Sequence, residues 1–221
     1  MTKERRISFT GTGFQALGWS LYNALLSIPI IPAAWGAAAL YRWLTRNLTF
    51  DDGTKASFEG QGGQVWGYFA LSVLLGYVPL LFRTAENAET ISYISFGFSI
   101  LMLPISAAIG IRIMRWLFEN IRFSDGTNFI FKGSYAPYLG WLLLSSLSVF
   151  TIIGWAWVSV AFLRWVCHNI EADSIKIDFT GSGWGLLWRS FLASLASLFI
   201  IPIPWIWLWV LKWGISNIVI R

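Results

Sequence analysis

The segment Arg42-Trp43-Leu44-Thr45-Arg46-Asn47-Leu48-Thr49-Phe50-Asp51-Asp52-Gly53-Thr54-Lys55-Ala56-Ser57-Phe58-Glu59-Gly60 contains the two motifs that decide the fold. The first is Arg/Lys-Trp-x-x-x-Asn and the second is Phe-x-Gly, and each occurs four times in the chain. Interleaved motifs at near-constant spacing indicate four copies of one structural unit. The first motif comprises Arg42, Trp43 and Asn47; Arg115, Trp116 and Asn120; Arg164, Trp165 and Asn169; and Lys212, Trp213 and Asn217. The second comprises Phe9 and Gly11; Phe58 and Gly60; Phe131 and Gly133; and Phe179 and Gly181.

The composition favours a membrane protein. Apolar residues make up 56% of the chain and charged residues only 12%, with a mean hydropathy of +0.61. Soluble domains average about 25% charged residues, so this chain lacks the polar side chains needed to cover a soluble surface. The 15 Trp are also typical of membrane interfaces. We attribute the net charge of +5 to membrane topology, and we expect no nucleic-acid partner.

The apolar stretch of each unit is interrupted near its middle, by Pro29 and Pro32 in the first unit, Gly154 in the third, and Pro202 and Pro204 in the fourth. An unbroken helix over such a stretch would be about 50 Å long, whereas the hydrocarbon core of a bilayer is about 30 Å thick. Each unit is therefore predicted to be a hairpin of two helices. The expected fold is mainly α, a polytopic membrane protein with pseudo-fourfold symmetry and about eight short transmembrane helices at residues 13–30, 33–48, 63–82, 92–120, 135–152, 155–170, 184–201 and 204–217. The chain is one membrane domain, with repeats at approximately 5–50, 51–123, 124–172 and 173–221.

The second unit contains a longer insertion. Its Phe and Arg are 57 residues apart, against 33 in each of the other units. The segment 83–90 within it is polar and carries three charged residues. We expect a longer helix pair with a charged loop on the far side of the membrane. A separate ninth helix near residues 92–103 is the alternative.

The linkers between units are predicted to be β-hairpins. Apolar and polar residues alternate on both sides of Asp52-Gly53, and the pattern recurs around Asp125-Gly126. Asp-Gly is a strong signal for a two-residue hairpin turn. The third linker, residues 170–179, has no such glycine, so we expect a different turn there.

The two ends of the chain match the two halves of one linker. Residues 5–11 end in Phe-x-Gly, and residues 217–221 begin with the motif Asn. Left unpaired, each half would expose a strand edge with free backbone groups. We therefore expect the ends to pair antiparallel, with Ile218 and Ile220 near Ile7 and Phe9, and to close the four units into a ring.

The positions of the basic residues predict one orientation. Of 16 Lys and Arg, only Arg83 lies between the two helices of a unit. Basic residues concentrate on the cytoplasmic side of membrane proteins. Both termini and all linkers are therefore expected in the cytoplasm.

One known family has a similar pattern. The stretch from Pro32 and Trp35 through Arg42, Asn47, Gly53, Phe58 and Gly60 resembles the YjgN-like family of bacterial inner-membrane proteins, a domain of unknown function. The chain departs from that pattern at Gly154, where Pro is usual, and at Lys212, where Arg is usual. The resemblance implies a multi-pass protein of the bacterial inner membrane, and it implies no activity.

The four basic motif residues, Arg42, Arg115, Arg164 and Lys212, have two interpretations. In the first, their stems are buried and their charges reach the headgroups. In the second, they bind an anion or a lipid phosphate, which suits the forked guanidinium. The four motif Asn residues are expected to cap helix C-termini, because Asn tolerates left-handed backbone geometry.

The sequence offers no catalytic or metal site and implies no cofactor. His168 and Cys167 are adjacent, but consecutive residues rarely reach one metal ion, and no further His or Cys is present. The Gly-rich segments at residues 11–13, 60–63 and 181–185 resemble phosphate-binding loops, yet a tight strand-to-helix corner explains them as well.

We expect a non-enzymatic membrane protein, a scaffold or accessory subunit. Its expected partners are membrane lipids, anionic ones included, another membrane protein or a second copy of itself. The alternative is a channel or facilitator for an anion or small solute along the pseudo-fourfold axis. A polar central passage lined by the motif Arg residues would favour the channel, and a packed apolar centre would favour the scaffold.

The predicted orientation can be tested by cysteine labelling in intact cells, in a Cys167→Ser background. An impermeant maleimide should label Glu86→Cys or Glu89→Cys, which lie in the charged loop of the second unit. It should not label Asp52→Cys or Asp125→Cys. The reverse pattern would contradict the orientation.

Overall fold

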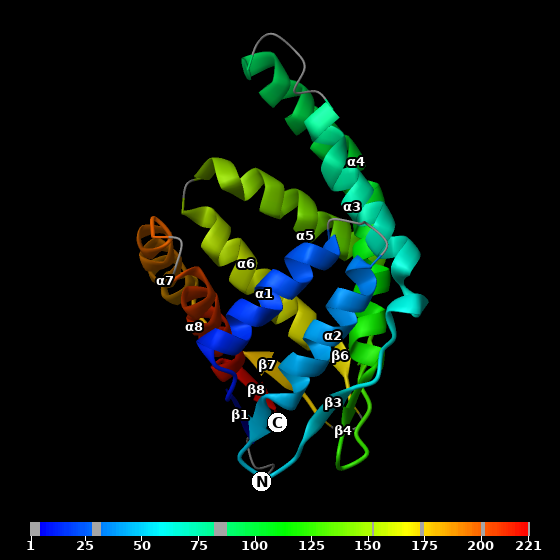
Figure 1. Ribbon diagram of the computed structural model, residues 1–221, viewed down its shortest axis with the longest axis vertical. Helices are drawn as coiled ribbons and strands as arrows, with labels where there is room; N and C mark the ends of the chain where they lie inside the picture. The colour runs from blue at the N-terminus through cyan, green and yellow to red at the C-terminus, as the bar shows by residue number, and fades with distance from the viewer. Residues whose placement is uncertain are drawn as a thin grey trace.

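The computed structural model describes the chain apart from residues 1–4, 28–31, 82–87, 152, 173–174, 200–201 and 221. Its helices form a ring of four hairpins, in which each helix packs against the next and α8 packs against α1 (Figure 1). The eight predicted helices are confirmed, and the observed bounds of each lie within about five residues of the predicted ones. They are α1 (Gly13–Ser27), α2 (Ala33–Arg46), α3 (Trp66–Leu81), α4 (Ala88–Glu119), α5 (Tyr135–Ser148), α6 (Gly154–His168), α7 (Gly183–Ala196) and α8 (Ile203–Ser216).

The alternative of a ninth helix is wrong. Residues 92–103 lie inside α4, which continues through Pro104 to Glu119 without a break. Together α3 and α4 therefore form the longer helix pair predicted for the second unit. Short 3₁₀ turns lie at Gly62–Gln64, before α3, and at Val149–Thr151, after α5.

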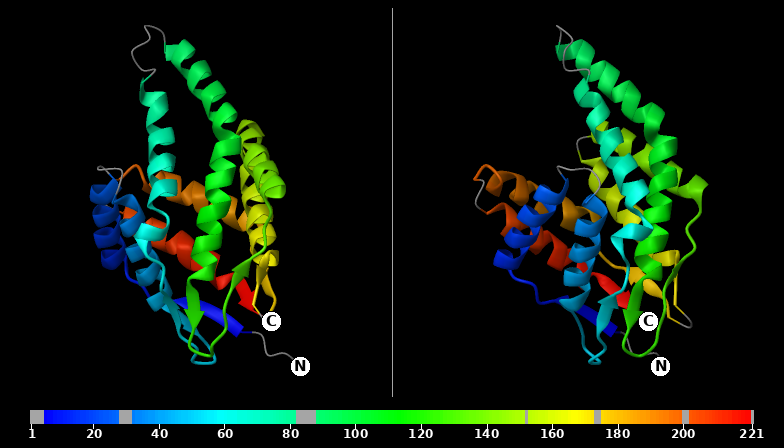
Figure 2. Two further views of the ribbon diagram at one scale, coloured as in Figure 1. Left: turned by 90° about the vertical axis from the view of Figure 1, so that its right-hand side faces the viewer. Right: turned by 45° about the vertical axis from the view of Figure 1, so that its right-hand side comes forward.

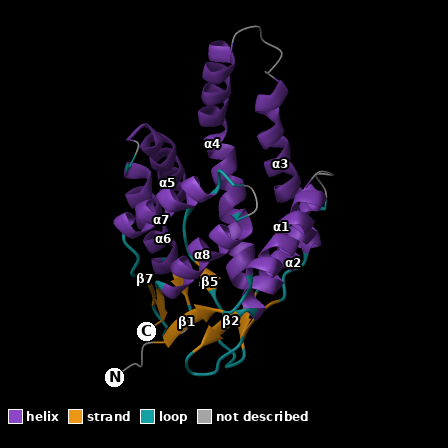
Figure 3. Ribbon diagram, turned by 60° about the vertical axis from the view of Figure 1, so that its left-hand side comes forward, coloured by secondary structure: helices purple, strands orange, loops and turns teal. Residues whose placement is uncertain are grey.

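Short strands lie at one end of the helix ring, together with both chain termini (Figure 3). They pair in three small sheets, with strand order β2-β1-β8-β7 in the largest, and β3-β4 and β5-β6 in the others. Figure 2 shows the helices extending away from this end, with α3 and α4 reaching furthest. The strands are β1 (Arg5–Phe9), β2 (Leu48–Phe50), β3 (Ala56–Phe58), β4 (Ile121–Phe123), β5 (Ile130–Phe131), β6 (Ile170–Glu171), β7 (Ile177–Phe179) and β8 (Ile218–Ile220).

The prediction that each linker folds into a β-hairpin is wrong. The turns are present, since Gly53 and Gly126 have φ of +81° and +87°. The strands beside them, however, pair with the other end of their own unit: β1 with β2, β3 with β4, β5 with β6 and β7 with β8, all antiparallel. Within the described part of the linkers, only the isolated bridges Arg122–Asn128 and Ala172–Ile175 join the two sides. A helix hairpin returns the chain to its starting level, so the strands before and after it emerge side by side and pair there.

The predicted pairing of the chain ends is confirmed. β1 and β8 are antiparallel neighbours, with Arg5 opposite Ile220 and Arg6 opposite Val219. Ile218 and Ile220 pack with Ile7 in one apolar cluster. Phe9 belongs to a different cluster, so that part of the expected face is wrong. The first and fourth units are thereby joined, and the ring is closed.

Arg5 links this closure to the linker turns. Its guanidinium lies 2.9 Å from the Asp52 carboxylate and 3.0 Å from that of Asp125. Hydrogen bonds from Thr54 and the charge of Arg5 lower the pKa of Asp52, and Thr127 and Arg5 lower that of Asp125 in the same way. The stabilisation these carboxylates give is present at neutral pH and is lost as the pH falls through their lowered pKa values.

Helix length does not support eight membrane crossings. The described helix that is long and apolar enough to cross a membrane is α4, over Phe96–Glu119, and only 17% of its most apolar 18-residue stretch is buried. α3 contains a shorter apolar segment, Trp66–Val78. The other six helices have 14 or 15 residues, or about 21–23 Å, which is less than the hydrocarbon thickness of about 30 Å.

The closed ring predicts tolerance of circular permutation. The test joins the termini by a short Gly-containing linker and opens the chain between Asp52 and Gly53. Every strand pair is then kept, because β2 pairs with β1 and β3 pairs with β4, not with each other. The permuted protein should unfold in detergent within a few degrees of the parent protein. Opening the chain inside α7, between Leu186 and Leu187, is the control and should prevent folding. If the permutant opened between Asp52 and Gly53 does not fold, the closure of the ring is contradicted.

Candidate functional site

Within each unit the two repeated motifs meet at a glycine. In the third unit the Phe131 and Trp165 rings pack edge to face, with centroids 5.9 Å apart and planes at 82°. A Cβ on Gly133 would lie 2.4 Å from the Phe131 ring and 3.0 Å from that of Trp165. Only glycine therefore allows the two rings to close over the backbone. The same arrangement holds for Phe9, Gly11 and Trp43, for Phe58, Gly60 and Trp116, and for Phe179, Gly181 and Trp213.

The motif Asn connects the end of each hairpin to its beginning. The Asn47 side chain donates to the Trp43 carbonyl over 2.8 Å, and its own carbonyl accepts the Thr10 N–H over 3.0 Å. The predicted capping role is confirmed, but not the left-handed geometry, since φ at Asn47 is −96°. Asn120, Asn169 and Asn217 make the equivalent pairs of hydrogen bonds.

Three of the four basic motif residues join one unit to the next. Arg42 donates to the Gly60 carbonyl over 2.8 Å, Arg115 to that of Gly133 over 3.3 Å, and Arg164 to that of Gly181 over 2.8 Å. Each acceptor is the Phe-x-Gly glycine of the following unit. These contacts give the three guanidinium groups a structural role. The predicted binding of a lipid phosphate by the motif residues stays a hypothesis.

The Gly-rich corners are also contacts between units. A Cβ on Gly62 would lie 2.7 Å from the Trp35 backbone, and a Cβ on Gly183 would lie 2.7 Å from the Trp157 ring. Gly13 faces Trp205 in the same way. These geometries favour the tight-corner interpretation over phosphate binding.

The corner between the second and third units lacks the pairing of a glycine with a Trp of the preceding unit. Tyr135 replaces the glycine in the third unit. In the second unit the place of Trp35, Trp157 and Trp205, seven residues before the motif basic residue, is taken by the exposed Ala108. The Tyr135 hydroxyl donates to the Pro104 carbonyl over 3.1 Å. The large and the small residue are thus exchanged between the two units in sequence, and this hydrogen bond joins the second unit to the third.

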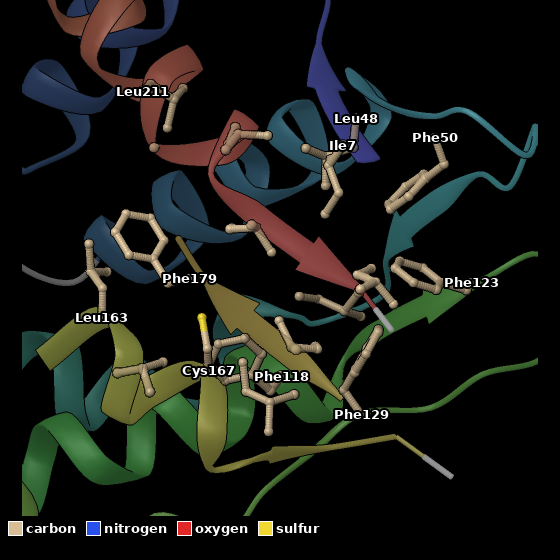
Figure 4. Close-up of a pocket in the computed structure, with 18 residues that line it drawn as sticks. Ile7, Leu48, Phe50, Phe118, Phe123, Phe129, Leu163, Cys167, Phe179 and Leu211 are labelled. Carbon is tan, nitrogen blue, oxygen red and sulfur yellow. The ribbon is translucent and has the colours of Figure 1, made fainter. Parts of the chain in front are cut away.

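A central apolar cavity of about 380 Å³ lies inside the strand end of the ring (Figure 4). All four units line it, and the lining side chains are apolar. They include Phe50, Phe123, Cys167, Phe179 and Leu211, whose side chains surround the space in Figure 4. The motif Arg residues are not among the lining residues. The described residues therefore form no polar passage at this level of the axis.

Cys167 and His168 point in different directions. Cys167 is buried and lines the central cavity. His168 is exposed, with Nδ1 2.7 Å from the Arg164 carbonyl oxygen and Nε2 3.5 Å from the Asp178 carboxylate. Across the described residues, no group of three or more His, Cys, Asp or Glu side chains is placed to hold a metal ion.

Two features of this region were not predicted from the sequence. The cavity depends on which strands pair, and the linkers were expected to pair differently. Arg189 received no role from the sequence. It lies within α7, where its guanidinium is 4.9 Å from the centre of the Trp213 ring. Its spacing of eight residues from Gly181 was the available signal, because Trp19 and Trp141 occupy that position in other units.

Comparison of the chain with protein-family models, with characterised proteins and with solved structures finds no match. The resemblance to the YjgN-like family therefore stays a prediction.

The ring-glycine-ring arrangement can be tested in one unit with a matched control. Gly133→Ala should lower the free energy of unfolding by about 1–3 kcal/mol, because its Cβ overlaps the buried Phe131 ring. Gly140→Ala lies on α5 with nothing within 4 Å of the added Cβ, and should be neutral or stabilising by up to about 1 kcal/mol. Denaturant titration in detergent measures both, and equal effects would contradict the proposed close packing.

Proposed function

We propose that the chain is a non-enzymatic membrane protein, a scaffold or accessory subunit that binds lipid or another membrane protein. The observation that carries this proposal is the apolar outer surface of the helices. Phe14 on α1 is 76% exposed, Leu101 on α4 is 68% exposed, and Trp184 on α7 is 67% exposed. Soluble monomers rarely expose contiguous apolar patches of more than a few hundred Å², so a lipid environment accounts best for such side chains around the ring.

The helix connections suggest how deeply each hairpin enters the membrane. The connection between α5 and α6 carries Val149 and Phe150, and that after α7 carries Leu198 and Phe199; all four are at least two-thirds exposed. The first hairpin has Ile28-Pro29-Ile30-Ile31 in sequence at this place. Apolar tips on helices of about 21–23 Å fit hairpins that end inside the hydrocarbon. The long second hairpin has a charged tip and fits a full crossing.

Backbone hydrogen bonding near the two described tips agrees with this placement. A hydrocarbon environment requires that backbone polar groups be paired within the protein. The Leu198 and Phe199 N–H groups donate to the Leu195 and Ala196 carbonyls. The hydroxyls of Ser148 and Thr151 donate to backbone carbonyls three residues earlier. Polar groups near these tips are thus used locally.

The interior favours a scaffold over a channel. A channel for an anion or polar solute needs polar groups along its path. The central cavity has apolar lining, and Arg42, Arg115 and Arg164 are bound to carbonyls of the next unit. The repeated motifs are accounted for by architecture, which agrees with a non-enzymatic role. The proposed location is the bacterial inner membrane, with both termini and the strand end in the cytoplasm.

Spin labels on the reconstituted protein test this placement, in a Cys167→Ser background. Labels at Phe150→Cys and Leu198→Cys should be relaxed strongly by oxygen and weakly by a water-soluble nickel chelate. Labels at the exposed Lys55 and Lys176 of the strand end are the controls and should show the opposite. Strong relaxation by nickel at both tips would mean that the tips lie in water, and would refute insertion to partial depth.

A further inference from the structure

The fourth unit breaks the repeat at two positions that lie close together. Lys212 replaces the motif Arg, and Arg189 occupies the place of Trp19 and Trp141 in the first and third units. Trp19 packs near its motif Trp43, with ring centroids 6.2 Å apart. In the fourth unit a guanidinium takes that place beside the motif Trp213. The fourth unit thus carries two cations at this pair of positions, where each of the other units carries one.

Arg189 is held in place mainly by aromatic rings. The carbon at the centre of its guanidinium lies 4.9 Å from the ring centre of Trp213 and 5.5 Å from that of Trp209. Its Nη1 donates to the Gly185 carbonyl over 3.0 Å, which uses one of five N–H groups. Its Nε is buried and has no hydrogen-bond partner among the described residues. The guanidinium is therefore positioned, but most of its donors remain available.

Lys212 lacks the contact that its counterparts make. Its equivalent acceptor would be the Gly11 carbonyl, and no hydrogen bond joins the two, although the structure describes both residues. Lys212 is exposed and lines, with Arg189, a cavity of about 360 Å³ between β1, α7 and α8. Trp209, Trp213 and residues of β1 complete its wall, and no carboxylate is among the lining residues.

We propose that this cavity, the Arg189–Lys212 site, binds a phosphate group, as carried by the headgroup of an anionic phospholipid. Two cations without a neutralising carboxylate favour an anion, and guanidinium and ammonium donors both suit phosphate oxygens. The site lies where the helices meet the strands. In the membrane placement proposed above, this is the level of the lipid headgroups. The choice of a lipid as the source of the phosphate rests on that placement. Free phosphate is the other source with the same chemistry.

Lipid binding by the detergent-solubilised full chain tests the site. Native mass spectrometry with added phosphatidylglycerol should show that Arg189→Gln and Lys212→Gln each weaken binding about tenfold, which is the loss of one charge-assisted hydrogen bond. Arg189→Trp should do the same while restoring the residue of the first and third units, so a folding defect is not expected. Lys55→Gln, an exposed linker change, is the matched control and should bind as the parent does. Equal phosphatidylglycerol binding by all five proteins would overturn the proposal.

A competition with inorganic phosphate separates the two sources. Displacement of phosphatidylglycerol by millimolar phosphate, with the same dependence on Arg189 and Lys212, supports a phosphate site open to the free ion. Resistance to phosphate, with that dependence kept, supports a lipid headgroup. If the spin labels instead place the hairpin tips in water while phosphate binding still depends on Arg189, the membrane placement fails and the anion site stands.

Discussion

The structure depends on the backbone of one glycine in each unit. The missing Cβ of Gly60 lets the Phe58 and Trp116 rings pack within its own unit, and its carbonyl accepts the Arg42 guanidinium of the preceding unit. A side chain here would separate the rings, and a shift of the backbone would remove the acceptor. In the second, third and fourth units, folding of the unit and its attachment to the preceding unit are thus coupled through one residue. This coupling explains why the motifs recur at fixed spacing while the rest of the helices differ.

Local signals predicted local structure well. The helix hairpins follow from Pro and Gly inside long apolar stretches, and the paired ends follow from counting strand halves. The linker hairpins were predicted from Asp52-Gly53, and the turn is there. The partner strand was wrong, because pairing is decided by which strands the helix hairpins bring together. A turn signal cannot report that geometry, and the central cavity enclosed by the strands was missed for the same reason.

The eight predicted crossings lack support for a different reason. Hydropathy indicates that a segment is apolar, and basic residues indicate which end lies in the cytoplasm. Neither indicates depth. Depth follows from helix length together with the polarity of the tip, and only the α3–α4 hairpin combines a long helix with a charged tip. A positive-inside pattern is the same for a hairpin that crosses twice and for one that turns back within the hydrocarbon, so the pattern alone does not distinguish them.

In a ring built from copies of one unit, contacts shared by all copies are accounted for by the assembly of the ring. The Phe, Gly, Trp and Asn positions belong to this class, and so do the three motif Arg residues that hold the next unit. A position where one copy differs has been released from that requirement, unless a neighbour has changed to compensate. Tyr135 and Ala108 are such a compensated pair, because the large and the small residue are exchanged and the Tyr135 hydroxyl still bonds to the preceding unit. Arg189 and Lys212 are not, since Arg189 uses one donor on the Gly185 carbonyl and leaves its buried Nε unpaired, and Lys212 does not bond to Gly11, the equivalent acceptor. The search for function in this chain therefore belongs at the contact between the fourth and first units, where the repeat has changed without restoring the contact it lost.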